Sequence, residues 1–129
     1  MITALYIDDC EFLLKMVSQY LMQNEDLSIE TATSSGEASA MLRNRDYDML
    51  IMDYNLKCGL ETGLIHQIRK EGRSVPVIFF TLETCHETEE RIRSLGNIWF
   101  VRKCSGPASG ISELERTIRK DVLPLQGEN

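Results

Sequence analysis

The sequence lacks the features of several protein classes. No apolar run approaches the length of a membrane span, and residues 1–3 do not provide the basic start of a signal peptide. A net charge of -6 argues against the positive surface that nucleic-acid binding needs. The four cysteines form no C-x-x-C pair, so neither a zinc ribbon nor a thioredoxin motif is indicated. We therefore expect a cytoplasmic protein with free thiols that contacts neither nucleic acid nor a membrane directly.

Length and composition are those of an ordinary globular domain. The chain has 129 residues, of which 43% are hydrophobic and 26% are charged. This length supports one domain with a single well-buried core. We expect that domain to cover residues 1–124 and residues 125–129 to form a loose C-terminal tail.

Four short apolar runs share the same ending, because each leads directly to a polar or charged residue. A continuous apolar run of this length is typical of a strand buried on both faces of a parallel sheet. Open α/β sheets place their ligands at the carboxyl ends of such strands. The four runs are residues 4–7 before Asp8 and Asp9, 49–52 before Asp53, 77–80 before Thr81, and 98–102 before Lys103.

Helical patterns separate these runs. Residues 27–32 alternate apolar and polar side chains, as expected of an edge strand, so the sequence predicts five strands alternating with five helices. This alternation predicts an α/β fold in which helices cover both faces of a parallel sheet. The helix predicted over residues 84–95 is unusually polar, and we expect it to be the least firmly held. The apolar stripe of the first helix is predicted at Leu13, Val17 and Leu21, backed by Leu14, Met16 and Tyr20. The stripe of the last helix is predicted at Ile111, Leu114, Ile118 and Val122 before Pro124. Ser34 or Ser35 is expected to start the second helix.

Aligned strand ends would gather three carboxylates, those of Asp8, Asp9 and Asp53. Such groups repel one another unless a cation lies among them, and oxygen ligands suit Mg²⁺. Lys103 and Thr81 add a positive charge and a hydroxyl donor, so that the carboxylate of Asp53 could act as a nucleophile in phosphoryl transfer. Taken singly, each residue has a simpler explanation as a helix cap or a solvated strand end. Their combination favours the functional interpretation.

The chain resembles a receiver domain of two-component response regulators, and the resemblance covers almost its whole length. The resemblance rests on Asp8-Asp9, Asp53, Thr81, and Gly96 and Phe100 leading to Lys103. It implies a doubly wound, flavodoxin-like three-layer sandwich, in which the five strands have the order 2-1-3-4-5.

The resemblance also implies a function. Asp53 would accept a phosphoryl group from a histidine kinase or a histidine phosphotransfer protein. Such a domain is a signalling switch that catalyses only its own phosphorylation and dephosphorylation. The implied roles are Mg²⁺ binding by Asp8, Asp9, Asp53 and the backbone carbonyl of Asn55, phosphoryl binding by Thr81 and Lys103, and switching by Thr81 and the aromatic ring of Phe100.

The chain departs from the family pattern in two loops. Cys104 follows Lys103 where the family usually has proline, and a cis peptide without proline would cost about 2.5–4 kcal/mol. Lys57 stands where proline is also common, in a loop that is about two residues longer than usual. Asn55 and Glu83 occupy positions with which the family tunes the lifetime of the phosphoryl group.

All four cysteines follow predicted strand ends, at Cys10, Cys58, Cys85 and Cys104, and His86 adjoins one of them. One hypothesis is that some thiols cluster at the rim of the site and confer redox or soft-metal sensitivity. The alternative, small loop residues without mutual contact, is favoured because the thiols are not spaced for ligation.

Two other functions remain open from the sequence. One is a phosphate-independent interaction module, suggested by the missing Lys–Pro pair and the longer loop. The other is a Mg²⁺-dependent hydrolase that uses Asp53. In all cases the fourth helix, the strand carrying Trp99 and the last helix form the expected docking face, for a downstream effector or for a second copy in a homodimer. The chain could be a stand-alone receiver or part of a longer regulator.

Overall fold

The computed structural model describes residues 2–23, 26–53, 61–81, 86–103 and 107–126. Strands and helices alternate along the described chain, as the apolar pattern predicts. No helix among these residues combines the length and the apolarity that a membrane crossing requires. The elements are β1 (Ile2–Ile7), α1 (Glu11–Leu21), β2 (Leu27–Ala32), α2 (Ser35–Asn44), β3 (Met49–Met52), α3 (Glu61–Lys70), β4 (Val77–Thr81), α4 (His86–Arg93), β5 (Ile98–Arg102), α5 (Pro107–Thr117), the π-helical turn η1 (Ile118–Val122) and α6 (Leu123–Gln126).

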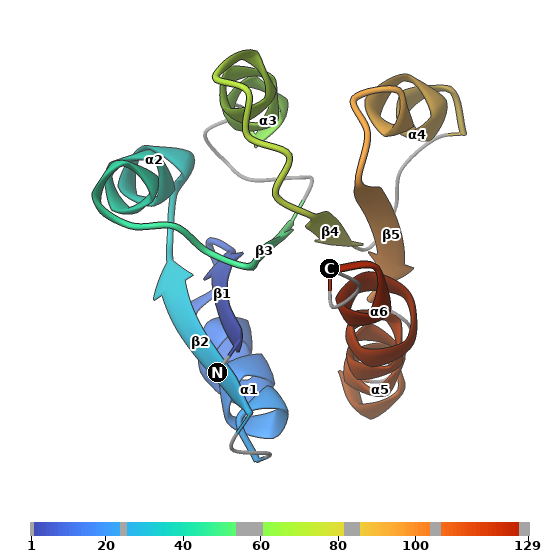
Figure 1. Ribbon diagram of the computed structural model, residues 1–129. Helices are drawn as coiled ribbons and strands as arrows, with labels where there is room; N and C mark the ends of the chain where they lie inside the picture. Colours follow the sequence, from blue (N-terminus) through green and yellow to red (C-terminus); the bar gives the residue numbers. More distant parts are fainter. Residues whose placement is uncertain (1, 24–25, 54–60, 82–85, 104–106, 127–129) are drawn as a thin grey trace.

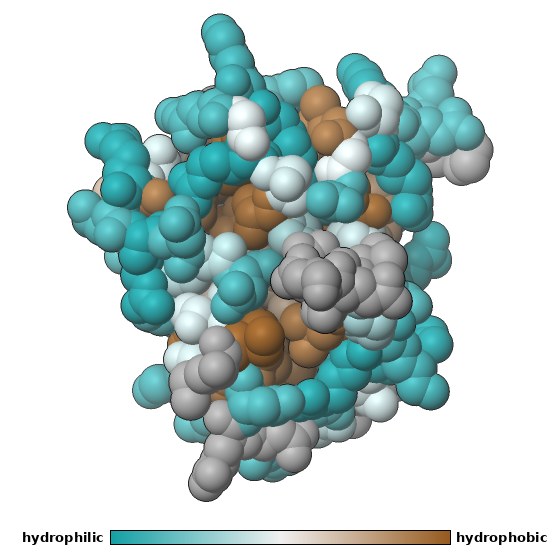
Figure 2. Space-filling view, viewed as in Figure 1, coloured by the Kyte–Doolittle hydropathy of each residue, from teal (hydrophilic) through white to brown (hydrophobic). Residues whose placement is uncertain are grey.

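The five strands form one parallel sheet with the order β2-β1-β3-β4-β5. Helices α1 and α5 cover one face, and α2, α3 and α4 cover the other (Figure 1). The predicted α/β sandwich and its strand order are therefore confirmed. In the space-filling view, hydrophilic residues cover the outer sides of the helices and apolar residues show between them (Figure 2).

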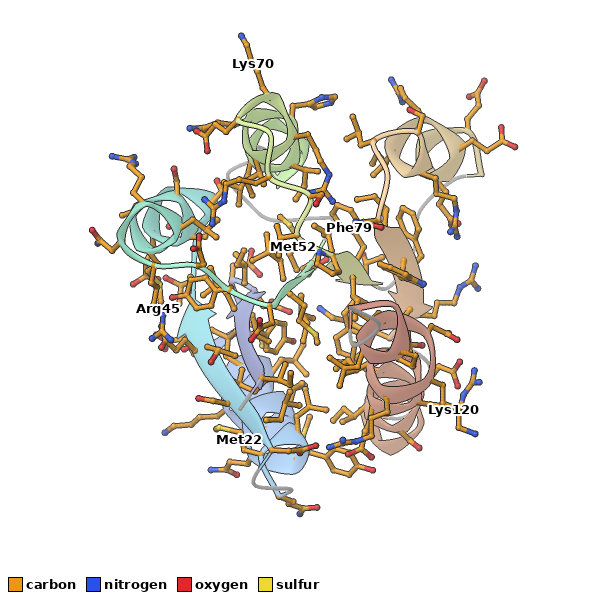
Figure 3. All side chains as sticks on the ribbon, in the orientation of Figure 1. Met22, Arg45, Met52, Lys70, Phe79 and Lys120 are labelled. Atoms are coloured by element: carbon orange, nitrogen blue, oxygen red, sulfur yellow. The ribbon has the colours of Figure 1, made fainter. Side chains whose placement is uncertain are left out.

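The core lies in two layers because successive residues of a strand point to opposite faces of the sheet. On β1, Ala4 and Tyr6 belong to the layer beneath α1 and α5, whereas Leu5 and Ile7 belong to the layer beneath α2, α3 and α4. Every residue of β3 is buried. Met52 lies with Phe79 on the α3 side of the sheet (Figure 3).

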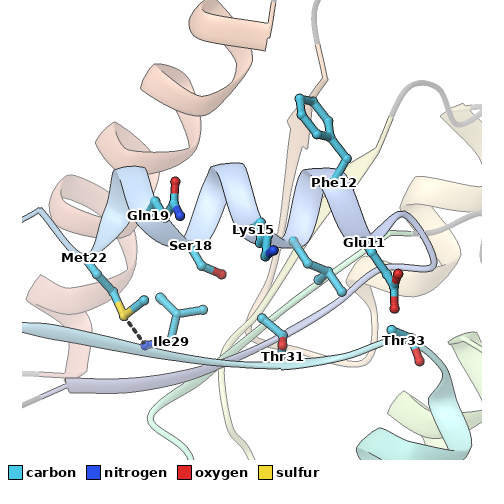
Figure 4. A pocket seen from close by; sticks show the side chains of 10 residues that line it. Glu11, Phe12, Lys15, Ser18, Gln19, Met22, Ile29, Thr31 and Thr33 are labelled. Atoms are coloured by element: carbon cyan, nitrogen blue, oxygen red, sulfur yellow. Dashed lines mark hydrogen bonds between the residues drawn. The ribbon is translucent and has the colours of Figure 1, made fainter.

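Strand β2 is an edge strand, as its alternating pattern predicts. Its outer side faces an open groove beside α1, and there Sδ of Met22 accepts a hydrogen bond from N–H of Ile29 at 3.4 Å (Figure 4). Phe12 points away from β2 and is 71% exposed. Because this amide of the edge strand already has a side-chain acceptor, it is not available for pairing with a further strand.

Helix α2 begins as predicted. Oγ of Ser34 accepts a hydrogen bond from N–H of Glu37 at 3.1 Å, and Oε1 of Glu37 accepts one from N–H of Thr33 at 2.7 Å. This arrangement is close to a capping box, but Glu37 bonds to the N–H of Thr33, the residue before the cap, and not to that of Ser34. Helix α3 is followed by Gly72 in a left-handed conformation with φ of 82°, which glycine adopts without steric cost.

Three sequence expectations need correction. The buried stripe of α1 runs through Leu14, Val17 and Leu21, while Leu13 is only half-buried, because the sheet lies under the Leu14 side of the helix. Helix α4 begins at His86 and ends at Arg93, and so is shorter than the predicted range 84–95.

The last helix runs further than predicted. Its apolar stripe is buried as expected, but the helical course continues through Pro124 to Gln126 instead of ending before the proline. A proline inside a regular α-helix lacks an N–H donor and clashes with the preceding turn. Here Pro124 is the second residue of α6, directly after the wider π-helical turn, where N–H of Leu123 bonds to the carbonyl of Ile118.

Candidate functional site

The candidate site lies at the carboxyl edge of the sheet, because hydrogen bonds between strands continue one residue beyond their ends. N–H of Asp8 donates to the carbonyl of Ala32 at 3.1 Å, and N–H of Asp53 donates to the carbonyl of Ile7 at 3.1 Å. On the other side, N–H of Lys103 donates to the carbonyl of Thr81 at 2.8 Å. Asp8, Asp53 and Lys103 are thus held at one edge by the backbone itself.

Lys103 connects the two central carboxylates. Its Nζ lies 2.8 Å from Oδ2 of Asp8 and 3.1 Å from Oδ2 of Asp53. Burial by itself would lower the pKa of Lys103, but the hydrogen bonds and charges of Asp8 and Asp53 outweigh it, and the pKa is raised. Lys103 therefore carries a full positive charge at neutral pH, directly beside the carboxylate of Asp53.

Asp8, Asp9 and Asp53 form a cluster in which one carboxylate oxygen from each residue lies within 4.8 Å of the others. Among the described residues, the three carboxylates and the ammonium of Lys103 leave an excess of two negative charges, which matches a divalent cation. Oxygen donors that supply only part of a coordination shell suit Mg²⁺, since this ion keeps several waters. The donor set fits the predicted metal; the fourth predicted ligand, Asn55, lies outside the described residues.

Asp8 is fully buried and accepts two further hydrogen bonds. N–H of Cys10 donates to its Oδ1 at 2.9 Å, and the hydroxyl of Tyr6 donates to its Oδ2 at 3.2 Å. Burial, followed by the charge of Asp8, raises the pKa of Tyr6 well above its usual value, so the phenol stays protonated. Sequence reasoning missed Tyr6, although a tyrosine inside an apolar strand signals a hydroxyl that needs a partner.

The remaining predicted residues lie on β4 and β5. Thr81 is buried at the end of β4, between β3 and β5. Phe100 lies two residues before the end of β5. Its side chain is half-buried and stacks on Phe79, with the ring centroids 5.3 Å apart. The guanidinium of Arg93 on α4 lies 4.8 Å from the Phe100 centroid, a cation–π contact that sequence reasoning also missed.

Several predictions fall on residues outside the described part of the chain. They concern Lys57 and its loop, Glu83, and the thiols of Cys58, Cys85 and Cys104. Cys10 is described, and it is free and exposed. The cysteine-cluster hypothesis and the loop departures therefore stay predictions.

The chain matches the family "Response regulator receiver domain" over residues 4–115. It is 30% identical over 124 residues to protein-glutamate methylesterase/protein-glutamine glutaminase 1 of Syntrophomonas wolfei, a match that covers 91% of this chain and 34% of that protein. It is 31% identical over 94 residues to the probable transcriptional regulatory protein TcrX of Mycobacterium tuberculosis, covering 73% of this chain and 39% of that protein. The chain thus spans little more than a third of the length of these curated relatives.

A solved structure agrees with the sequence match. The non-phosphorylated HemR receiver domain from Leptospira biflexa has a TM-score of 0.79 and 25% identity, covering 92% of this chain and 95% of that one. The matched region, residues 4–115, extends from within β1 to within α5 and includes every described residue of the carboxyl-edge site. The chain therefore belongs to the family of response regulator receiver domains.

Proposed function

We propose that this chain is a phosphoryl-accepting signalling switch in which Asp53 is the nucleophile. The observation that carries the proposal is the position of Lys103, whose ammonium contacts both Asp8 and Asp53 at the edge of a cluster of three carboxylates. A phosphoryl group attached to Asp53 would lie within reach of this ammonium, which lies 3.1 Å from Oδ2 of Asp53. Positive charge facing the phosphoryl oxygens is the main requirement of phosphoryl transfer.

The proposed donor is a phosphohistidine of a histidine kinase or a histidine phosphotransfer protein. A carboxylate oxygen of Asp53 forms a bond to phosphorus, the bond between phosphorus and the imidazole nitrogen breaks, and that nitrogen keeps the electron pair and takes up a proton. Lys103 faces the transferred oxygens, and the hydroxyl of Thr81 is proposed to donate to one of them. Beyond its own phosphorylation and dephosphorylation, we propose no enzymatic turnover.

Mg²⁺ is the proposed cofactor. Asp8, Asp9, Asp53 and the backbone carbonyl of Asn55 would hold it, and the bound ion would offset negative charge on the carboxylates and on the phosphoryl oxygens. The support for this proposal is the oxygen-only donor set and its two excess negative charges.

The proposed output is a change of the surface formed by α4, β5 and α5, to which Phe100 and Arg93 belong. Phosphorylation adds a charge of about -1.5 to -2, which can shift an existing equilibrium between two conformations. We propose that Thr81 and Phe100 transmit this shift to an effector or to a second copy of the chain. A cytoplasmic location and a receiver domain of residues 1–124 belong to the same proposal.

The test is the intact mass after incubation with Mg²⁺ and a small acyl phosphate. We expect one phosphoryl adduct on the wild-type protein, none on Asp53→Asn and none when the metal is chelated. Asp46→Asn is the matched control, since the side chain of Asp46 is 98% exposed, and it should accept the group like the wild type.

Two results would contradict the proposal. A folded wild-type protein that accepts no phosphoryl group in the presence of Mg²⁺ would support the phosphate-independent module. An adduct that persists in Asp53→Asn would place the acceptor on another residue.

A further inference from the structure

Tyr6 lies on β1 two residues before Asp8, which directly follows the strand, and the two side chains meet on the same face of the sheet. The Tyr6 ring is fully buried in the core layer beneath α1 and α5. Its hydroxyl reaches the end of the strand and donates to Oδ2 of Asp8. This hydrogen bond thus links a carboxylate of the candidate site to a side chain of the buried core.

The two carboxylate oxygens of Asp8 accept hydrogen bonds from different donors. Oδ2 accepts from the hydroxyl of Tyr6 at 3.2 Å and from Nζ of Lys103 at 2.8 Å. Oδ1 accepts from N–H of Cys10 at 2.9 Å. A carboxylate offers about four acceptor positions, two on each oxygen, so these bonds use both positions of Oδ2 and one of Oδ1. Oδ1 is then the oxygen with capacity for a cation.

The bond between Tyr6 and Asp8 also restrains rotation of the carboxylate. If Asp8 turned Oδ2 away, the hydroxyl of Tyr6 would lose its acceptor. Because Tyr6 is fully buried, water could not replace that acceptor. Leaving a buried donor unsatisfied is costly, so the conformation of the carboxylate is coupled to the packed ring. Lys103 restrains the same oxygen from the solvent side through a shorter, charge-assisted bond, so Oδ2 is held by both groups.

We propose that Tyr6 is a positioning residue of the carboxyl-edge site: its buried hydroxyl holds Oδ2 of Asp8 and thereby presents Oδ1 to a divalent cation. This inference rests on the proposed function, because it requires Mg²⁺ to bind at Asp8, Asp9 and Asp53. Groups that orient metal ligands in this way typically affect metal affinity by about 10- to 100-fold.

The test compares Mg²⁺ binding by calorimetric titration in the wild type, Tyr6→Phe and Tyr47→Phe. Tyr47 is a matched control, since it is also buried and its hydroxyl donates to a carboxylate, Oε1 of Glu30, at 2.6 Å. Each variant loses the hydrogen-bonded hydroxyl of a buried tyrosine, and thermal melts report the structural cost of each. We expect Tyr6→Phe to bind Mg²⁺ at least about tenfold more weakly and Tyr47→Phe to bind like the wild type.

A second measurement uses the wild-type protein and so does not depend on the folding of a variant. With ¹³C-labelled tyrosine, the Cζ resonance of Tyr6 should move on Mg²⁺ addition and that of Tyr47 should not. Equal affinities in the wild type and a folded Tyr6→Phe, or an unmoved Tyr6 resonance at Mg²⁺ saturation, would overturn the role of Tyr6. Absence of Mg²⁺ binding in the wild type would instead contradict the metal site of the proposed function, and with it the inference.

Discussion

Arg93 of α4 lies over the ring of Phe100 on β5, with its guanidinium carbon 4.8 Å from the ring centroid. The same ring also stacks on Phe79, with the ring centroids 5.3 Å apart and an interplanar angle of 19°. The predicted switch aromatic therefore contacts both a charged group of a polar helix and a buried ring of the neighbouring strand. This contact links α4 to the sheet in addition to the buried side chain of Ile92.

Arg93→Ala should lower the free energy of unfolding by about 0.5–1 kcal/mol, the usual contribution of a partly exposed cation–π contact. Urea denaturation measures this change. The matched control is Arg91→Ala, which removes an exposed arginine from the same helix. Equal effects of the two substitutions would show that the contact with Phe100 does not stabilise the protein.

Lys103→Met should destabilise the protein by about 3 kcal/mol or more, because removing one partner of a buried ion pair leaves the other charge uncompensated. The pair is well shielded, with side-chain exposures of 11% for Lys103 and 1% for Asp8. Lys120→Met, at an exposed position, is the control in the same denaturation experiment. If Lys103→Met lowers the free energy of unfolding no more than Lys120→Met does, the ion pair between Lys103 and Asp8 does not stabilise the protein.

Magnesium should stabilise the folded protein and chelation should remove the effect. At a free concentration of about 100 times Kd, a ligand that binds only the folded state adds about 2.7 kcal/mol to the free energy of unfolding. Asp9→Asn should weaken this response, because it removes one carboxylate of the cluster. Sodium chloride at matched ionic strength is the control, and an equal stabilisation by both salts would indicate screening without a specific site.

Tyr47 should make stability fall at high pH. Burial, followed by the hydrogen bond and charge of Glu30, raises the pKa of Tyr47 from 10.0 to about 12. Between these values the folded state holds a proton that the unfolded state has released, so this stabilisation is complete below pH 10 and is lost as pH rises through 12.

Denaturation at a series of pH values measures this effect as the difference between the wild type and Tyr47→Phe, which should shrink across that window. Tyr20→Phe, which leaves the contact with Glu30 intact, should preserve the wild-type profile. If the difference in unfolding free energy between the wild type and Tyr47→Phe stays constant with pH, the pKa of Tyr47 is not raised in the folded protein.

Much of the fold could be predicted because its signals are local. Each apolar run of the central strands must be buried on both faces, and this requirement together with the intervening helices leads to a parallel sheet. The placement of Asp8, Asp53 and Lys103 at one edge follows, since parallel strands end on the same side. The order of the strands came from the resemblance to receiver domains, because alternation alone is compatible with more than one order.

The set of elements and the polar residues at their carboxyl ends could therefore be predicted from the chain alone, because strand periodicity and burial act on neighbouring residues. Three contacts arise only when the elements pack: the sheet lies under Leu14 and not Leu13, the Tyr6 hydroxyl reaches Asp8, and Arg93 covers Phe100. These contacts depend on how side chains and packed elements are oriented by the whole core. No pattern within a single segment contains that information.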